Sequence, residues 1–91
     1  MNWKKYPPSI LHTGSDCFYQ ELIFERGDDK IYANIVEWTQ FDRKVWELHI
    51  QIPEELSITK MPITLINFSY VELDFLKITR HAKKIIKSLI K

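Results

Sequence analysis

Cys17 is the only cysteine in the sequence, and it is the side chain best suited by its chemistry to act as a nucleophile. A catalytic cysteine must form a thiolate and needs a base within hydrogen-bond reach. Asp16 stands next to Cys17 instead, and a neighbouring carboxylate raises the pKa of a thiol. No G-x-S-x-G motif occurs, and two glycines cannot build a phosphate-binding loop. We therefore expect no enzymatic activity.

Metal binding has little support in the spacing of the possible ligands. His12 and Cys17 lie on either side of Asp16, whereas His49 and His81 are each alone in their segments. A zinc site needs about four ligands, which usually occur as closely spaced pairs. The sequence therefore predicts no metal site and no cofactor.

The C-terminal segment is strongly basic. Residues 76–91 contain six Lys or Arg and no Asp or Glu, namely Lys77, Arg80, Lys83, Lys84, Lys87 and Lys91. Lysines near the C-terminal end of a helix are favourable through the helix dipole and need no partner. A dense positive face also attracts phosphate, so contact with nucleic acid is the alternative function.

The middle of the chain is acidic, although the net charge is only +1. Between Asp16 and Glu55 there are ten acidic and four basic residues. Alternation is expected to put three glutamates on the outward face of a sheet, and two aspartates lie in the first turn. Together they form the candidate partner-binding surface, which consists of Glu21, Glu25, Glu47, Asp28 and Asp29. It predicts binding to a basic surface of another protein, and its carboxylates argue against RNA stacking on the sheet.

Three runs have the alternation and composition of strands, at Cys17–Glu25, Ile31–Thr39 and Val45–Ile52. In the first run we expect Phe18, Leu22 and Phe24 to point inward, and Tyr19, Glu21, Ile23 and Glu25 outward. Arg26 to Asp29 is read as a turn. Met61–Asn67 is expected to form a short edge strand, where Pro62 is tolerated.

The pairing of the second and third runs stays open. A three-residue loop between them would pair Trp38 with Trp46, and a two-residue loop would pair Ile35 with Ile50. We favour the first because it brings two tryptophans together. A slip of one residue exchanges the faces of the strand.

The two ends of the chain flank this sheet. Pro7-Pro8 predicts an irregular arm over residues 1–15. Ser69 and Glu72 fit a capping box, which predicts a helix from Tyr70 to the chain end. The inward stripe of this helix would be Val71, Phe75, Ile78, Ala82, Ile85, Ile86 and Leu89.

These elements predict one α+β domain over residues 1–91. It would consist of an arm at 1–15, a three- to four-stranded antiparallel β-meander at 17–67 and one amphipathic C-terminal helix at 70–91. The same element order occurs in unrelated RNA-binding domains and in small phage-encoded inhibitors, and order alone carries no function. We expect a cytoplasmic, non-enzymatic accessory or inhibitory protein that binds another protein. Nucleic acid is the alternative partner and a homodimer is compatible with both, whereas no membrane contact is expected, because no segment has the ~18 consecutive apolar residues of a span.

Overall fold

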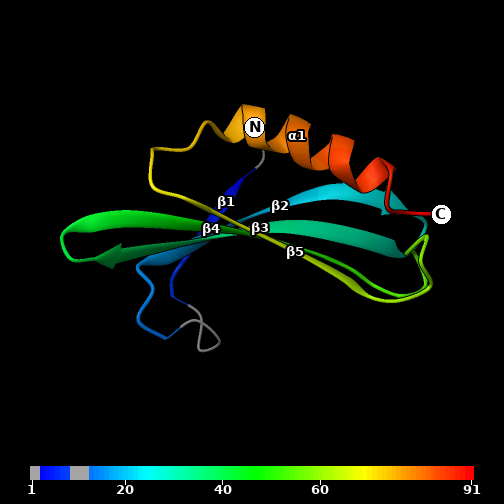
Figure 1. Ribbon diagram of the computed structural model, residues 1–91, viewed down its shortest axis with the longest axis horizontal. Helices are drawn as coiled ribbons and strands as arrows, with labels where there is room; N and C mark the ends of the chain where they lie inside the picture. The colour runs from blue at the N-terminus through cyan, green and yellow to red at the C-terminus, as the bar shows by residue number, and fades with distance from the viewer. Residues whose placement is uncertain (1–2, 9–12) are drawn as a thin grey trace.

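The computed structural model describes residues 3–8 and 13–91. Five strands form one antiparallel sheet in chain order, and one helix packs on one of its faces (Figure 1). The elements are β1 Lys4–Tyr6, β2 Cys17–Arg26, β3 Asp29–Gln40, β4 Arg43–Ile52, β5 Ile63–Ser69 and α1 Phe75–Lys87. The α+β meander with a C-terminal helix is confirmed, with one strand more than the predicted three or four.

The additional strand comes from the predicted N-terminal arm. Lys4, Lys5 and Tyr6 pair with Gln20, Tyr19 and Phe18 of β2. Tyr6 also stacks on Phe18, with the ring centroids 5.0 Å apart. The expectation of an irregular arm is therefore wrong at 4–6, because the two prolines only end this strand. Residues 1–2 and 9–12, with the candidate ligand His12, lie outside the described residues.

A β-bulge in β2 makes the predicted faces of this strand wrong up to Ile23, whereas those of Phe24 and Glu25 are correct. The register shifts between Leu22 and Phe24, so both Ile23 and Phe24 contact the core. Before the bulge, Tyr19 and Glu21 pair with Ile35 and Ala33, whose side chains are buried on the side of the sheet that α1 covers. The side expected to face outward is therefore the one under the helix. An extra residue in one strand of a pair produces this change of side, and strict alternation cannot reveal it.

β3 and β4 join through a two-residue turn. Gln40 pairs with Arg43, and the two turn residues, Phe41 and Asp42, have φ of 50° and 62°. Positive φ at both central residues is the type I′ geometry, which matches the twist of a hairpin. The favoured three-residue loop is therefore wrong. The loop has two residues, as in the alternative prediction, but Ile35 pairs with Leu48 and not with Ile50.

Phe41 is unusual in this turn, because its side chain is fully exposed and its φ is positive. Bulky residues rarely adopt this conformation, whereas asparagine tolerates it. We expect Phe41→Asn to raise the free energy of unfolding by about 1 kcal/mol, measured by urea denaturation. Phe41→Ala should give no comparable gain, since alanine lacks the polar side chain that lets asparagine tolerate positive φ. A less stable Phe41→Asn variant would contradict this interpretation.

The core lies between α1 and the sheet. It consists of Ile23, Ile31, Ala33, Ile50, Ile52, Leu56, Ala82 and Ile86. The predicted inward stripe of the helix is largely correct, since Phe75 packs on Trp3 and Tyr19. Val71 is the exception, because it precedes the helix and is 72% exposed.

Both ends of the predicted helix differ from the structure. α1 begins at Phe75, with Asp74 as its N-cap accepting a hydrogen bond from the Lys77 backbone N–H at 3.2 Å. Ser69 instead bonds the backbone of Val71. The chain leaves the helix after Lys87, and the last residues turn back to the β4–β5 connection. There the Lys91 N–H donates to the Leu56 carbonyl at 2.8 Å.

A buried polar chain fixes the helix to the sheet. The Trp3 indole N–H donates to Thr79 Oγ1 at 2.8 Å, and the Thr79 hydroxyl lies 2.7 Å from Glu21 Oε2. Glu21 is only 7% exposed. A buried carboxylate needs a donor, so these contacts tie α1 to β2 and to the residue that precedes β1.

Candidate functional site

The predicted acidic surface does not exist as one face. Glu21 is buried under α1 and bonded to Thr79. Glu25 follows the bulge, so it pairs with Lys30 on the opposite face from Glu21. Glu47 also lies on the face away from the helix, where its carboxylate accepts a hydrogen bond from His49 at 2.8 Å. Asp28 and Asp29 are exposed at the β2–β3 turn. The predicted grouping is therefore wrong, because the bulge and the helix separate its members.

A cluster around Glu37 was not predicted from the sequence. Glu37 accepts hydrogen bonds at 2.9 Å from both the Lys44 ammonium and the Trp46 indole N–H. Cys17 Sγ and the Tyr19 hydroxyl lie 3.6 and 3.5 Å from the same carboxylate. These side chains come from β2, β3 and β4, which the strand pairing brings side by side. The cluster contains a thiol, an acid and an amine, so it has to be tested as a catalytic site.

The electrostatics of this cluster favour a structural role. Burial raises the pKa of the Cys17 thiol and raises the pKa of Tyr19 to about 12. Burial also raises the pKa of Glu37, but the hydrogen bonds from Lys44 and Trp46 outweigh it, and the pKa lies below its ordinary value. The thiol therefore stays protonated at neutral pH, which is the opposite of what nucleophilic catalysis requires. Glu37 acts as the hydrogen-bond acceptor that holds three strands together.

Glu37→Gln should remove a pH dependence of stability. Because the folded pKa of Glu37 lies below its unfolded value, its ionised form stabilises the fold above pH 4.5, and this is lost as the pH falls through the folded pKa. At pH 7 the variant should lose about 1.5–3 kcal/mol of unfolding free energy. In urea denaturation from pH 7 to 3, this difference should shrink below pH 4.5. The exposed Glu25→Gln is the control, and a difference constant with pH would contradict the assignment.

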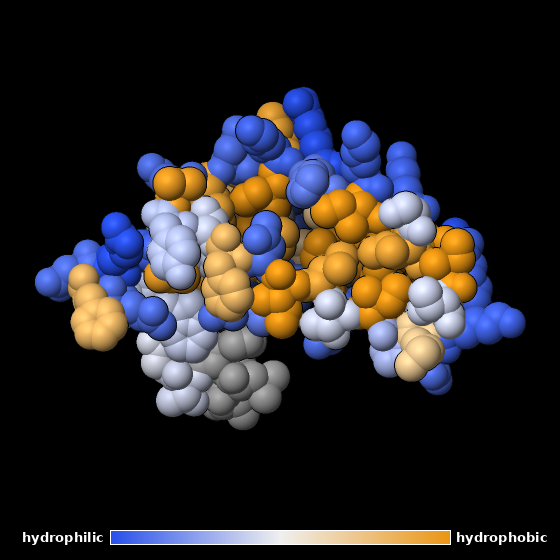
Figure 2. Space-filling model, viewed as in Figure 1, coloured by the Kyte–Doolittle hydropathy of each residue, from blue (hydrophilic) through white to orange (hydrophobic). Residues whose placement is uncertain are grey.

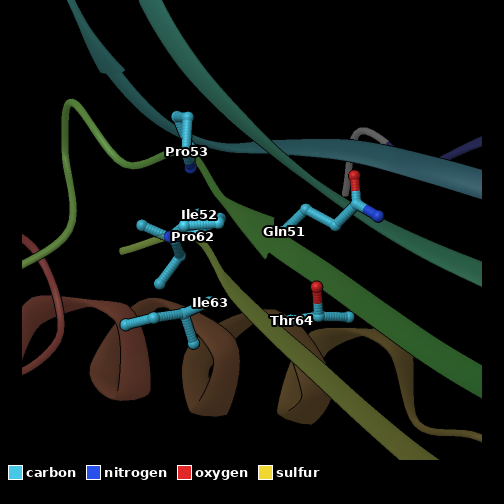
Figure 3. A pocket seen from close by; sticks show the side chains of 6 residues that line it. All are labelled: Gln51, Ile52, Pro53, Pro62, Ile63 and Thr64. Atoms are coloured by element: carbon cyan, nitrogen blue, oxygen red, sulfur yellow. The ribbon is translucent and has the colours of Figure 1, made fainter. Parts of the chain in front are cut away.

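Other features of the described residues offer little chemistry. In residues 3–8 and 13–91, no three His, Cys, Asp or Glu side chains converge as a metal site would require. The helix found in this part of the chain is too short and too polar to cross a membrane. Figure 3 shows a shallow hollow at the end of the β4–β5 pair, lined by Gln51, Ile52, Pro53, Pro62, Ile63 and Thr64. None of these six side chains ionises, so the hollow holds no acid or base.

The basic face of α1 is present as predicted. All six predicted cations are exposed, namely Lys77, Arg80, Lys83, Lys84 and Lys87 on α1 and Lys91 after its end. Within the described part of the chain, none of them lies within ion-pair distance of a carboxylate. This face therefore has an uncompensated positive charge.

An apolar groove runs between α1 and β5. The helix packs over β2, which leaves the helix-facing side of β4 and β5 only partly covered. Two hollows of about 180 and 200 Å³ lie along this gap and share Leu48 and Asn67. We define the β5–α1 groove by its principal lining residues, Leu48, Ile50, Leu65, Asn67, Ile78 and Ile85. Figure 2 shows the continuous apolar surface below the basic helix.

One wall of this groove is an open edge of the sheet. β5 is the last strand, and apart from β4 no segment of the described chain hydrogen-bonds to its backbone. The seven residues of β5 include no charged side chain. At the other edge, β1 has only three residues, and two of them are lysines. Short and charged edges resist pairing, whereas a long neutral edge invites it.

The sequence predicted the edge but not the groove. Met61–Asn67 was expected as an edge strand, and the strand lies at Ile63–Ser69. The sequence placed Ile85 in the inward stripe of the helix, with the polar His81 beside this stripe, and gave no other signal for the groove. Only the position of α1 over β2 shows that they face a gap. Comparison with protein-family models, with curated proteins and with solved structures gives no match.

Proposed function

We propose that this protein is a non-enzymatic interaction module that binds an extended segment of another protein along β5. The observation that carries the proposal is the combination of an open strand edge and an apolar groove beside it. An extended peptide can add to such an edge through backbone hydrogen bonds, while its alternate side chains enter pockets. The single buried thiol of Cys17 suits a reducing compartment such as the cytoplasm.

The binding geometry follows from the strand. The incoming segment would form the sixth strand of the sheet, beside Ile63–Ser69. Every second side chain would point toward α1 and contact Leu65, Ile78 and Ile85. The remaining side chains would point to the other face, beside Ile66 and Phe68, which are more than half exposed. An accessory or inhibitory role is compatible with this mode of binding.

A peptide-display selection tests the proposal. The immobilised protein is offered a library of random twelve-residue peptides, and the enriched peptides are titrated into ¹⁵N-labelled protein. We expect alternating apolar residues, few prolines and glycines, and chemical-shift changes confined to β5 and the groove side of α1. Chemical-shift changes on the sheet face away from α1, or at Arg80, Lys83 and Lys87 alone, would overturn the proposed surface.

Nucleic-acid binding is the second candidate, and the five exposed cations of α1, with Lys91 beyond its end, favour it. Each neutralised phosphate contributes about −0.9 to the log–log dependence of affinity on salt for duplex DNA. Contact through the helix would therefore give a slope of several units. Reversal of Arg80, Lys83, Lys84 and Lys87 to glutamate should abolish such binding. Binding that survives this reversal would exclude the helix as the nucleic-acid site.

A further inference from the structure

The first hollow of the β5–α1 groove has an aromatic wall. It has a volume of about 180 Å³ and lies between Trp46 and Leu48 of β4, Leu73 of the β5–α1 connection and Ile78 of α1. The Trp46 indole N–H donates to Glu37 at 2.9 Å, which fixes the ring in this wall. A cavity of roughly 150 Å³ is large enough for a benzene ring. The first hollow therefore has the size for one aromatic side chain, and its lining favours one, because aromatic pairs attract beyond the area they bury.

The second hollow is aliphatic and lies one strand repeat away. Its lining includes Ile50, Leu65 and Ile85, and it shares Asn67 with the first hollow. Along β5 the first hollow extends from Asn67 to Ser69, and the second extends from Leu65 to Asn67. Alternate residues of an extended chain point to the same face and lie about 6.5 Å apart. Two alternate side chains of one added strand would therefore meet one hollow each.

Only a long side chain can reach the first hollow from a strand added beside β5. Asn67 and Ser69 stand between that strand and the hollow, on the side of β5 that pairs with Leu48 and Trp46. These two side chains are short and leave a low wall. Neighbours at about 7–8 Å across strands are still within reach of aromatic and other long side chains. A ring can therefore cross this wall, whereas alanine would end above β5.

The linings favour a neutral occupant other than a second copy of the chain. In the described part of the chain, His81 in the second hollow is the only ionisable side chain of either lining. A charge buried in the first hollow would have no partner. The one aromatic residue of β5 is Phe68, which pairs with Glu47 on the opposite face of the sheet. A second copy added through β5 would therefore leave the first hollow without a ring.

Resting on the proposed function, we infer that the β5–α1 groove recognises an extended segment with an aromatic residue and, two residues away, a branched aliphatic residue. The aromatic ring occupies the first hollow and contacts Trp46, Leu73 and Ile78. The aliphatic side chain occupies the second hollow and contacts Leu65 and Ile85. The residue between them points to the opposite face of the sheet.

Four synthetic peptides test the inference, all acetylated and amidated at their ends. The parent contains Phe-Thr-Leu between flanks of alternating threonine and glutamine. Two variants have alanine in place of phenylalanine or leucine, and the fourth contains Phe-Thr-Thr-Leu with one threonine fewer in its flanks. Isothermal titration gives the affinities, and hydrogen exchange of the β5 amides locates the bound peptide. Loss of the buried ring should weaken binding at least about tenfold. The Phe-Thr-Thr-Leu peptide should bind as weakly as the variant without leucine, because its leucine points to the other face.

Truncation on the protein identifies the hollow that holds the ring. Leu73→Ala removes one wall of the first hollow, and Leu73 is half-buried and precedes α1. On this variant the cost of replacing the phenylalanine of the peptide should fall to about threefold or less, since the two side chains are in contact. The matched control is Ile66→Ala, which truncates a more than half-exposed aliphatic side chain on the opposite face of β5. This control should retain the full tenfold cost.

The outcomes separate this inference from the proposed function. If the parent and its alanine variants bound equally and all slowed exchange of the β5 amides, the inference would be overturned and strand addition would stand. Equal costs on Leu73→Ala, Ile66→Ala and the wild type would place the ring outside the first hollow and also overturn the inference. If no peptide protected β5, or if β5 became protected only as sedimentation showed dimers, both the inference and the proposed function would fail.

Discussion

Replacing Thr79 with valine should lower the free energy of unfolding by about 2–3 kcal/mol, because valine has the shape of threonine but no hydroxyl. The Glu21 carboxylate, 7% exposed, would lose the donor 2.7 Å away. The Trp3 indole N–H would lose its acceptor at the same time. Urea denaturation at pH 7, with the slope compared between variants, gives the value directly.

The controls for this prediction separate polarity from packing. Thr79→Ser retains the hydroxyl and should cost less than Thr79→Val. Combining Glu21→Leu with Thr79→Val removes both partners, so the double variant should be more stable than the sum of the single changes predicts. A Thr79→Val protein as stable as the wild type would show that the buried contact to Glu21 does not hold α1 on the sheet.

The second large effect is expected at Asn67, which lines both hollows of the β5–α1 groove. Asn67→Lys would place a long charged side chain in the groove and should weaken a display-selected peptide by more than tenfold. The physical reason is that a bound segment would bury this charge against Leu48 and Ile78 without a partner. Isothermal titration with the selected peptide measures the change.

Thr64→Lys is the matched control, because Thr64 lies on the same strand and pairs with Gln51 on the opposite face. This variant adds the same charge to β5 and should retain most of the affinity. Equal losses for Asn67→Lys and Thr64→Lys would mean that charge on the edge, and not occupation of the groove, decides binding. Both variants should unfold at nearly the wild-type urea concentration, because both positions are exposed.

The sequence predicted the layers of the fold because periodicity reports local geometry. The inward residues Ala82 and Ile86 of α1 and the strand runs of β2 to β4 follow from spacing alone. The predicted start of the helix was wrong because Ser69 and Asp74 both resemble N-caps. The sequence does not show that the helix begins at the residue that packs against Trp3 and Tyr19. The strand at Lys4–Tyr6 was missed because three residues are too few to show alternation.

The candidate site depended on details that a single sequence does not contain. The bulge at Ile23 decides that Glu21 is buried and Glu25 is not, yet it leaves no signature in the alternation. The Glu37 cluster needs the register that brings Cys17 and Trp46 to opposite sides of β3. The basic residues of α1 could be listed from the sequence, but the position of the helix over β2 could not.

Hydrogen exchange of the β5 backbone amides, with and without a saturating selected peptide, tests the central claim most directly. Strand addition would give new hydrogen bonds to the outward-facing N–H groups of Ile63–Ser69, so alternate amides there should exchange at least tenfold more slowly in the complex. The amides of β1 at the opposite edge should be unchanged. A peptide that binds without slowing any β5 amide would contradict the proposed mode of binding.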